Sequence, residues 1–192
     1  MSFPIRMTEI ETPVGEVVLA WRGDMFLGAF LELARDRTSW EPAYDTAGGG
    51  AALRKWITTR FPGAAIERGA PDGPALALVR YFAGDVRAID RVRVDPGGTE
   101  FQARVWASLR EIPAGETRTY SEIAAAAGRP GAARAAGGAV GSNPIPIVIP
   151  CHRVVGADRK LTGFGGGLPR KRWLLEHEGA RIDAARGQLA LL

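Results

Sequence analysis

Residues 119–155 read TYSEIAAAAGRPGAARAAGGAVGSNPIPIVIPCHRVV, and this stretch decides the fold of the second half of the chain. Thr119 followed three residues later by Glu122 is a capping-box pattern, which predicts a short helix that stops at Gly128. Pro130 suits the first turn of a second helix, GAARAAGGAV. Two helices joined by a short turn predict a helix-turn-helix.

The second of these helices carries little chemical information on its surface. It offers alanine and glycine almost throughout, and Arg134 is its one long side chain. A helix that reads base edges presents Arg, Lys, Asn or Gln to them, so this helix favours close, sequence-tolerant docking in a minor groove. The alternative is tight packing against another helix, although an unpaired buried guanidinium would be costly.

Cys151 is the only cysteine of the chain. A lone cysteine is usually an inert small hydrophobe. Here His152 and Arg153 bring positive charge, which would favour the reactive thiolate, and the Asn143 amide can brace the turn that leads in. Three prolines stiffen the approach to the thiol: Pro144, Pro146 and Pro150.

The side-chain geometry around the thiol depends on the backbone. If residues 147–153 are extended, Cys151 and His152 point to opposite sides, and a direct hydrogen bond between them is not expected. A water molecule between them, or a bend after Pro150, would then be required. An orienting partner for His152 must come from elsewhere, and Glu178 in the terminal helix is the candidate.

Length and composition set the class of protein. The chain has 192 residues and 46% hydrophobic residues, as in a folded globular protein of one large or two small domains. No apolar run approaches the roughly 20 residues that span a bilayer. The N-terminal MSFPIRMTEIE lacks the apolar core of a signal peptide. One cysteine and two histidines allow no internal disulfide and are too few for a typical structural zinc site, so we expect a cytoplasmic protein without metal.

The positive charge is concentrated in one segment. The net charge of the chain is +4, whereas residues 117–172 carry nine Lys or Arg against Glu122 and Asp158, a local net charge of +7. Such a segment is the usual footprint of a phosphate-bearing partner such as DNA. A solvated surface is the alternative.

Residues 1–96 are expected to form an α/β or α+β domain. The runs VGEVVLAW and MFLGAFLEL predict strands joined by a tight turn at 22–24. The runs AALRKWITTRF and PALALVRYFAG have helical spacing, and AGGG at 47–50 predicts a loop. RAIDRVRVDP at 87–96 reads as a strand, and 95–98 as a linker.

The second part begins with a helix that opens on another capping box, Thr99 with Gln102. A terminal helix, PRKRWLLEHEG, follows later, and its PRKR is expected on a solvated or DNA-facing helix end. The tail 181–192 is equally compatible with order and fraying. One face of the first helix is apolar: Phe101, Val105, Leu109 and Ile112.

Several separate motifs occur in a fixed order: AARAAGGAV, GSNPIPIVI, PCHRV and LTGFGGGLPRKRWLLEHEG. Together they resemble the O6-alkylguanine-DNA alkyltransferases, the methylated-DNA–protein-cysteine methyltransferases, over about residues 98–180. The resemblance implies an N-terminal ribonuclease-H-like α/β domain over 1–96. It further implies a helical DNA-binding and alkyl-transfer domain over 97–180, with a winged-helix-like helix-turn-helix.

The resemblance also implies an activity. Such proteins bind duplex DNA through the minor groove and flip the alkylated guanine out of the stack, and O4-alkylthymine is a further expected substrate. By similarity, Arg134 fills the space left behind, Tyr120 hydrogen-bonds the flipped base, and a water connects Cys151 to His152. The alkyl group forms a thioether with Cys151, so each molecule reacts once. No cofactor is expected, and the protein is expected to be a monomer.

The expected site residues fall into three sets. The catalytic relay comprises Asn143, Cys151, His152 and Glu178. The DNA contacts comprise Tyr120, Ala133, Arg134, Ala135, Gly137 and Arg153. The substrate pocket comprises Tyr120, Pro146, Val154, Phe164 and Gly165.

The chain departs from the family pattern at two pocket positions. Many members have Tyr where this chain has Phe164, and animal members often have Ser at Gly165, so we expect a roomier pocket that admits groups larger than methyl. GFGGG at 163–167 lacks the strand and the Lys-Ser/Thr of a phosphate-binding loop, which favours a hinge lining the pocket. The zinc ligands and the cysteine-rich regulatory domain of some members are absent, so a regulator that senses phosphotriester damage is not expected.

Two other functions compete with alkyl transfer. A damage sensor would bind alkylguanine without repairing it, but family relatives of that kind replace the cysteine, which Cys151 argues against. A Cys-His hydrolase needs a direct contact between nucleophile and base together with an oxyanion site, and a histidine immediately after the cysteine is awkward for both.

Overall fold

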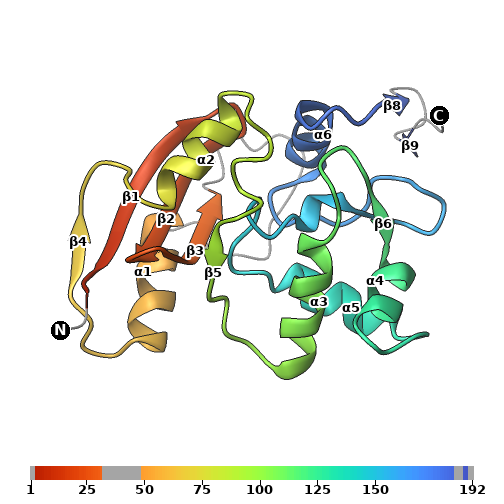
Figure 1. Cartoon of the computed structure of the whole chain (residues 1–192). Helices are drawn as coiled ribbons and strands as arrows, with labels where there is room; N and C mark the ends of the chain where they lie inside the picture. Colours follow the sequence, from red (N-terminus) through yellow and green to blue (C-terminus); the bar gives the residue numbers. More distant parts are fainter. Residues whose placement is uncertain (1–2, 32–48, 184–187, 190–192) are drawn as a thin grey trace. The chain divides into compact units, whose positions relative to one another are not determined.

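The computed structural model describes residues 3–31, 49–183 and 188–189. The backbone divides into two compact units, Met1–Pro96 and Gly97–Leu192. Figure 1 shows the course of the chain through both units. None of the helices in these described ranges is long and apolar enough to cross a membrane.

The first unit is built on a mixed five-stranded sheet of order β4-β1-β2-β3-β5. The central strands pair antiparallel, β1 with β2 and β2 with β3, whereas β4 and β5 pair parallel at the two edges. The predicted turn at 22–24 is confirmed, because Arg22 pairs with Met25 across Gly23 and Asp24. The strands are β1 (Ile5–Thr12), β2 (Gly15–Arg22), β3 (Met25–Leu31), β4 (Ile66–Arg68) and β5 (Arg93–Val94).

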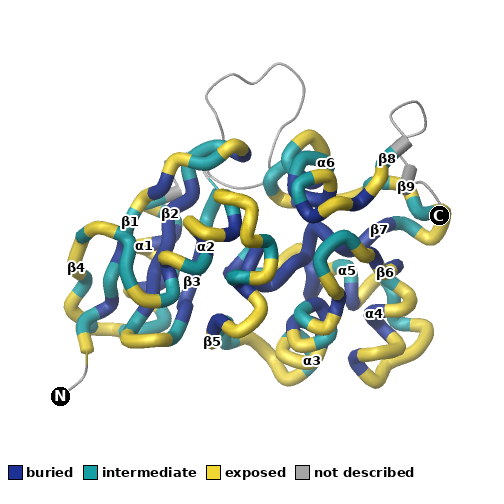
Figure 2. The backbone as a smooth tube through the Cα atoms, turned by 45° about the horizontal axis from the view of Figure 1, so that its top comes forward, coloured by how far each residue is buried: buried dark blue, intermediate teal, exposed yellow. Residues whose placement is uncertain are grey.

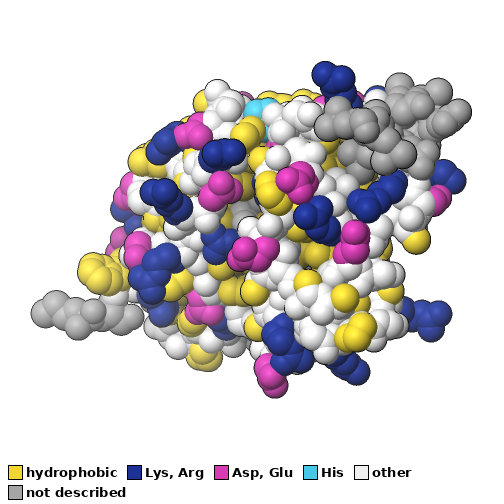
Figure 3. All heavy atoms as spheres, turned by 45° about the vertical axis from the view of Figure 1, so that its right-hand side comes forward, with side chains coloured by type: hydrophobic (Ala, Val, Ile, Leu, Met, Phe, Trp, Pro, Cys, Tyr) yellow, Lys and Arg dark blue, Asp and Glu magenta, His cyan; other side chains and the backbone are white. Residues whose placement is uncertain are grey.

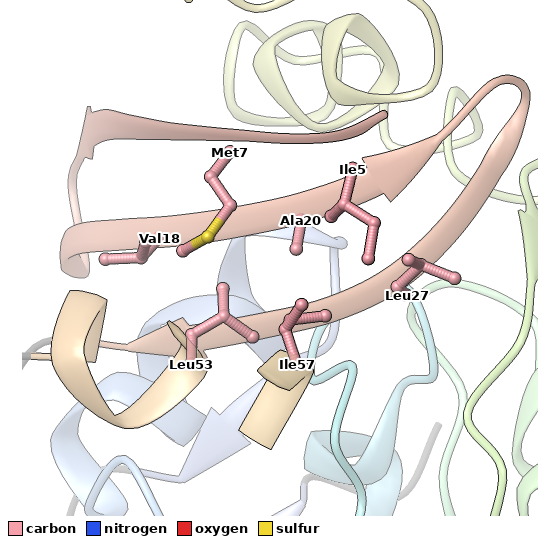
Figure 4. Close-up of a cluster of buried hydrophobic side chains, with 7 residues drawn as sticks. All are labelled: Ile5, Met7, Val18, Ala20, Leu27, Leu53 and Ile57. Carbon is pink, nitrogen blue, oxygen red and sulfur yellow. The ribbon is translucent and has the colours of Figure 1, made fainter. Parts of the chain in front are cut away.

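Two helices accompany the sheet, α1 (Gly49–Arg60) and α2 (Ala75–Phe82). Leu53 and Ile57 of α1 pack against side chains of β1, β2 and β3 to form a buried apolar cluster (Figure 4). The tube is dark blue along much of β2 in Figure 2, which agrees with five consecutive buried residues in that strand. The members of the cluster are Ile5, Met7, Val18, Ala20, Leu27, Leu53 and Ile57.

Two predictions for this unit need correction. The run AGGG was expected to form a loop, but Gly49 and Gly50 are the first residues of α1, and 47–48 lie outside the described residues. The run 87–96 was expected to be one strand, but only Arg93–Val94 pairs with β3, and the residues before it form turns. Its apolar residues Ile89 and Val92 are buried although they do not belong to a strand, so burial there does not require one.

The second unit is mainly helical. The helices are α3 (Glu100–Arg110), α4 (Tyr120–Ala126), α5 (Ala133–Gly141) and α6 (Leu168–His177). A 3-10 turn, η1 (Cys151–Arg153), leads into β7 (Val154–Val155), which pairs parallel with β6 (Arg118–Thr119). Near the end of the chain β8 (Ile182–Asp183) pairs antiparallel with β9 (Gln188–Leu189).

Both capping boxes are confirmed, with each threonine hydroxyl accepting from the backbone N–H three residues on. On α3, Val105 and Leu109 are fully buried as predicted, and Trp106 joins them. The helices α3, α4 and α5 contact one another, as Figure 1 shows in green to teal. The prediction that α5 starts at Pro130 is wrong, because the helix begins at Ala133 after a turn.

Candidate active site

The loop before Cys151 is held by one polar side chain. The Oδ1 atom of Asn143 accepts from the backbone N–H of Ile145 at 3.0 Å, and its Nδ2 atom donates to the carbonyl of Ile149 at 2.8 Å. Ile147 in the same loop has φ of 74°, which is strained for a β-branched residue, and its side chain is fully buried. Burial and these hydrogen bonds hold the backbone in this conformation.

The chain bends immediately after Pro150. Residues 147–153 do not form one extended run, because Cys151–Arg153 form a 3-10 turn and the Cys151 N–H donates to the Ile149 carbonyl at 2.8 Å. Of the two alternatives considered for this run, a bridging water or a bend after Pro150, the bend is present. Cys151 keeps 8% of its surface exposed, at the edge of the core.

His152 and Glu178 form a buried pair. The Nε2 atom of His152 lies 2.9 Å from Oε1 of Glu178, which follows directly after α6. A carboxylate can only accept, so Nε2 carries the proton and Nδ1 is left as an acceptor. Among the residues that the structure describes, Nδ1 has no hydrogen-bond partner. Phe164 lies beside the ring of His152, with its own ring edge-on at a centroid distance of 6.5 Å.

Arg153 completes this buried cluster. Its Nε and Nη2 atoms donate to the two oxygens of Glu178 at 2.9 and 2.7 Å, and Nη1 donates to the Ile112 carbonyl at 2.5 Å. Its side chain is only 2% exposed. We expected Arg153 at the DNA surface, and this geometry contradicts that expectation, because every nitrogen of the guanidinium is already occupied inside the protein.

The electrostatics follow from burial and from these contacts. Burial lowers the pKa of His152, so the ring is neutral despite the carboxylate beside it. Burial alone would raise the pKa of Glu178, but His152 and Arg153 together hold it well below its usual range. Burial raises the pKa of the Cys151 thiol, whereas the Asn143 side chain, Lys171 and nearby backbone N–H groups act in the opposite direction.

The expectation that His152 and Arg153 supply the charge that favours the thiolate is therefore wrong. The ring is neutral, and Arg153 is neutralised by Glu178. The groups that lower the pKa of the thiol are the Asn143 amide, the ammonium of Lys171 and the backbone N–H groups of Cys151 and His152.

Lys171 was missed as a site residue, because PRKR at 169–172 reads as a solvated helix end. The side chain of Lys171 is fully buried, and its Nζ donates to backbone carbonyls around the site. The helical period could have shown that Lys171 lies three residues before Leu174, on the apolar face of α6.

Tyr120 lies near enough to Cys151 to interact with it electrostatically. It is half-buried, its hydroxyl hydrogen-bonds Thr162, and burial raises its pKa, with a smaller contribution from Cys151. Among the other expected pocket residues, Val154 is fully buried and Phe164 is 9% exposed. Pro146 is half-buried, and Gly165 is exposed.

Part of the helix α5, including its one long polar side chain, is exposed to solvent. Arg134, Ala135 and Gly138 are exposed, Ala133 is half-buried, and Ala136 is fully buried. Half-buried Gly137 packs toward Tyr120, since a Cβ atom there would lie 3.7 Å from the tyrosine ring.

On the face drawn in Figure 3, Lys and Arg side chains in dark blue are interspersed with Asp and Glu in magenta. The segment 117–172 itself is partly neutralised. Some of its basic residues form ion pairs with acidic ones. Examples are Arg159 with Glu122 and Lys160 with Asp158. The local net charge of +7 therefore overstates the positive surface that a ligand would meet.

Comparisons with known proteins place the residues of this site within a known family. Residues 100–180 match the family model of the 6-O-methylguanine DNA methyltransferase DNA-binding domain. The methylated-DNA–protein-cysteine methyltransferase of Mycobacterium bovis is 43% identical over 183 residues, which cover 94% of this chain and 96% of that protein. The Salmonella typhimurium protein of the same name is 54% identical over 109 residues, 57% of this chain and 64% of that protein.

Solved structures give the same result. A crystal structure of Mycobacterium tuberculosis O6-methylguanine methyltransferase is 40% identical, with a TM-score of 0.67 and coverage of 94% of this chain and 96% of that one. The Mycobacterium tuberculosis protein in complex with DNA is 41% identical over 91% of each chain, with a TM-score of 0.65. The chain belongs to the methylated-DNA–protein-cysteine methyltransferase family.

Proposed function

We propose that this protein repairs DNA by direct reversal, as a methylated-DNA–protein-cysteine S-methyltransferase that reacts once. Its substrate is duplex DNA containing O6-alkylguanine, with O4-alkylthymine as a further candidate. The observation that carries the proposal is the juxtaposition of Cys151, held by Asn143, with the buried pair of His152 and Glu178. Membership of the family supports the same reading.

The proton of the thiol has a defined destination in this arrangement. Glu178 accepts from Nε2 of His152, so Nδ1 can accept the thiol proton, through a water molecule as the family resemblance implies. Arg153 keeps Glu178 ionised and fixed in place, and so acts through the pair rather than on the substrate. His152 is neutral beforehand, which is the state a proton acceptor needs.

The chemical step is a single displacement. The thiolate of Cys151 attacks the alkyl carbon, the bond from carbon to O6 breaks, and guanine leaves with the electron pair and is then protonated. The product is a thioether, from which no ordinary side chain can remove the alkyl group. The DNA is itself the alkyl donor, so the step needs no cofactor or metal.

DNA reaches the site through α5. Arg134 is exposed on a helix whose neighbouring surface residues are Ala and Gly, so the backbone can approach a minor groove closely while one guanidinium enters the stack. Tyr120, half-buried beside Cys151, then receives the flipped base together with Phe164, Pro146, Val154 and Gly165. Ala133, Ala135 and Gly137 contribute shape rather than hydrogen bonds.

The remaining assignments follow the family resemblance. The first 96 residues form a ribonuclease-H-like domain, residues 97–180 form a winged-helix-like domain with the helix-turn-helix α4–α5, and 181–192 form a tail. The protein acts as a monomer in the cytoplasm.

Intact-mass spectrometry tests the function directly. The protein is incubated with an equimolar duplex oligonucleotide that carries one O6-methylguanine, with unmodified duplex and the Cys151→Ala variant as controls. Alkyl transfer predicts one methylene-sized mass increment on Cys151 and none in either control. A damage sensor predicts binding without an increment, and a hydrolase predicts repeated turnover of an ester or amide.

A further inference from the structure

Arg159 has a backbone conformation that few arginines adopt. Its φ is 61°, in the left-handed region that favours glycine, and Ile147 is the other non-glycine residue with a positive φ in the described ranges. Ile147 is fully buried, whereas the side chain of Arg159 is 39% exposed. Core packing therefore does not explain why the chain keeps this strain at Arg159.

The strain arises in a closed turn over residues 156–160. The N–H of Arg159 donates to the Gly156 carbonyl at 3.0 Å, and the N–H of Gly156 donates to the Lys160 carbonyl at 3.0 Å. The Asp158 carboxylate accepts from the N–H of Lys160 at 3.2 Å and pairs with its ammonium at 2.9 Å. None of these bonds uses a side-chain atom of Arg159, so the turn would form at least as well with glycine at this position.

The guanidinium of Arg159 makes two long contacts. Its Nη2 atom lies 3.4 Å from Oε1 of Glu122, and its Nη1 atom lies 3.5 Å from the Thr117 carbonyl oxygen. A charge-assisted hydrogen bond is ordinarily about 2.7–2.9 Å long, so neither contact holds the guanidinium firmly. Glu122 does not depend on it, because Oε2 of Glu122 accepts from the N–H of Thr119 at 2.5 Å in the capping box. The charged end of Arg159 is thus available to a further partner.

The turn lies at the edge of the candidate site. It follows β7 directly, and β7 pairs with β6 so that Val155 is opposite Thr119, the residue before Tyr120. A few residues beyond the turn the chain reaches Gly163, where an added Cβ atom would lie 3.1 Å from the Tyr120 hydroxyl. The segment that carries Arg159 therefore starts and ends beside Tyr120, which receives the flipped base under the proposed function.

A flipped nucleotide brings phosphates to this edge. The base enters the pocket, but the sugar joins it to two backbone phosphates that remain outside. A guanidinium matches the oxygens of a phosphate with its parallel N–H groups. The carboxylate of Glu122 would repel a phosphate, and the guanidinium beside it offsets that charge.

We propose that Arg159 binds a backbone phosphate next to the flipped nucleotide, and that the strained turn is retained because it places this guanidinium at the edge of the site. The inference deepens the proposed function, on which it rests for DNA as the partner. Binding and stability then oppose each other at one residue, since the same arginine contacts DNA and strains its own turn.

The first test measures binding and stability together. Arg159→Gly removes both the charge and the strain. In a Cys151→Ala background, which cannot react, binding to a duplex with one O6-methylguanine is followed by fluorescence anisotropy between about 50 and 200 mM salt. Loss of one phosphate contact should reduce the slope of log affinity against log salt by about 0.9 and weaken binding about 5- to 10-fold at about 100 mM salt. The melting temperature should stay the same or rise.

Three controls accompany this variant. Arg159→Lys keeps the positive charge and should keep the salt slope. Arg80→Ala removes an exposed arginine of the first unit that pairs with Asp85, and it should also leave the slope unchanged. With Cys151 intact, Arg159→Gly should react with the free modified base at the parent rate, because that substrate has no phosphate.

The outcomes against the proposal are distinct. An unmoved salt slope for Arg159→Gly would refute the phosphate contact. A lower melting temperature would show that the arginine stabilises the turn, and would refute the opposition of binding and stability. A slower reaction with the free base would assign the effect to the loop that reaches Tyr120 instead of to DNA.

The second test identifies the phosphate. Each phosphate near the lesion is replaced in turn by a neutral methylphosphonate, and affinities are measured with and without Arg159→Gly in the Cys151→Ala background. At the contacted phosphate the replacement should weaken binding about 5- to 10-fold when Arg159 is present and little when it is absent. Additive losses at every phosphate would mean that Arg159 acts only through the overall charge, and would overturn the proposal.

These results separate the inference from the proposed function. If the intact protein takes up the methyl group, but Arg159→Gly changes neither affinity nor salt slope, only the role of Arg159 is contradicted. If the intact protein neither binds methylated duplex nor is methylated, the repair activity is contradicted, and the role of Arg159 with it.

Discussion

The Nε2 atom of His152 lies 2.9 Å from Oε1 of Glu178, and neither side chain has any exposed surface. Arg153 holds both oxygens of the same carboxylate. One carboxylate thus fixes the tautomer of the histidine and compensates a buried guanidinium. Its removal should affect both folding and reactivity.

Glu178→Gln should lower the free energy of unfolding at pH 7 by about 3–5 kcal/mol, because Arg153 loses its counter-charge inside the protein. The pKa of Glu178 is held below its ordinary value of 4.5, so its stabilising contribution is complete above pH 4.5 and decreases as the pH falls below that value. Urea unfolding between pH 7 and pH 3 measures this. The difference in unfolding free energy between the parent protein and the variant should decrease as the pH is lowered.

The matched control is Glu176→Gln, on the exposed side of α6, where the carboxylate pairs with Arg172. Its unfolding free energy should stay within about 0.5 kcal/mol of the parent. Equal effects of both substitutions would show that the buried cluster has no special role in stability.

Asn143→Ala should slow alkyl transfer and move the pH dependence of thiol alkylation upward. The substitution removes the hydrogen bonds to Ile145 and Ile149 and the interaction that lowers the pKa of Cys151. Leaving the partners unpaired should also cost about 1–3 kcal/mol of stability. Ser142→Ala is the neighbouring control, and a pH midpoint shared by both variants would contradict the assignment of Asn143.

Arg134→Ala should reduce the rate of repair in duplex DNA by at least ~10-fold, because base extrusion carries a cost of a few kcal/mol that the guanidinium offsets. Reaction with the free modified base should stay near the parent rate, since no stack has to be opened. Arg80→Ala, at a solvent-exposed arginine of the first unit, is the charge-matched control. Equal losses on duplex and free base would contradict the role of Arg134 in extrusion.

Gly165→Ser should lower the rate for benzyl-guanine substrates more than the rate for methyl substrates. Gly165 is exposed next to Phe164, and a larger side chain there would reduce the space for the alkyl group. Single-turnover rates on the two substrates give the ratio. An unchanged ratio would mean that selectivity is set elsewhere in the pocket.

Much of the local structure followed from the sequence. The two capping boxes form because Thr99 and Thr119 each satisfy a free N–H of the first helical turn within four residues of chain. The turn between β2 and β3 follows from Gly23, which adopts a φ of 57°. The prediction failed at 87–96, where apolar residues are buried in turns rather than in a strand, so their burial could not be told from strand spacing.

The active site shows more clearly which features can be predicted from the sequence and which require the tertiary structure. Residue type and order were enough to select Cys151, His152 and Glu178, because the sequence contains both a candidate nucleophile and the family motif. The buried positions of Arg153 and Lys171 could not be predicted in this way. Both are long, basic side chains in basic segments, and solvation is the ordinary outcome for such residues.

The sequence by itself determined the short helices α4 and α5, the proline-stiffened approach to one thiol and the family to which the chain belongs, since these depend on local spacing and motif order. Only the tertiary structure decided which cations are buried. Arg153 meets the carboxylate of Glu178, 25 residues away in the chain, and Lys171 meets carbonyls that become available only when loop and strand fold together. The charge state of the nucleophile depends on those distant partners, because the energy of a buried charge is set by what surrounds it in space.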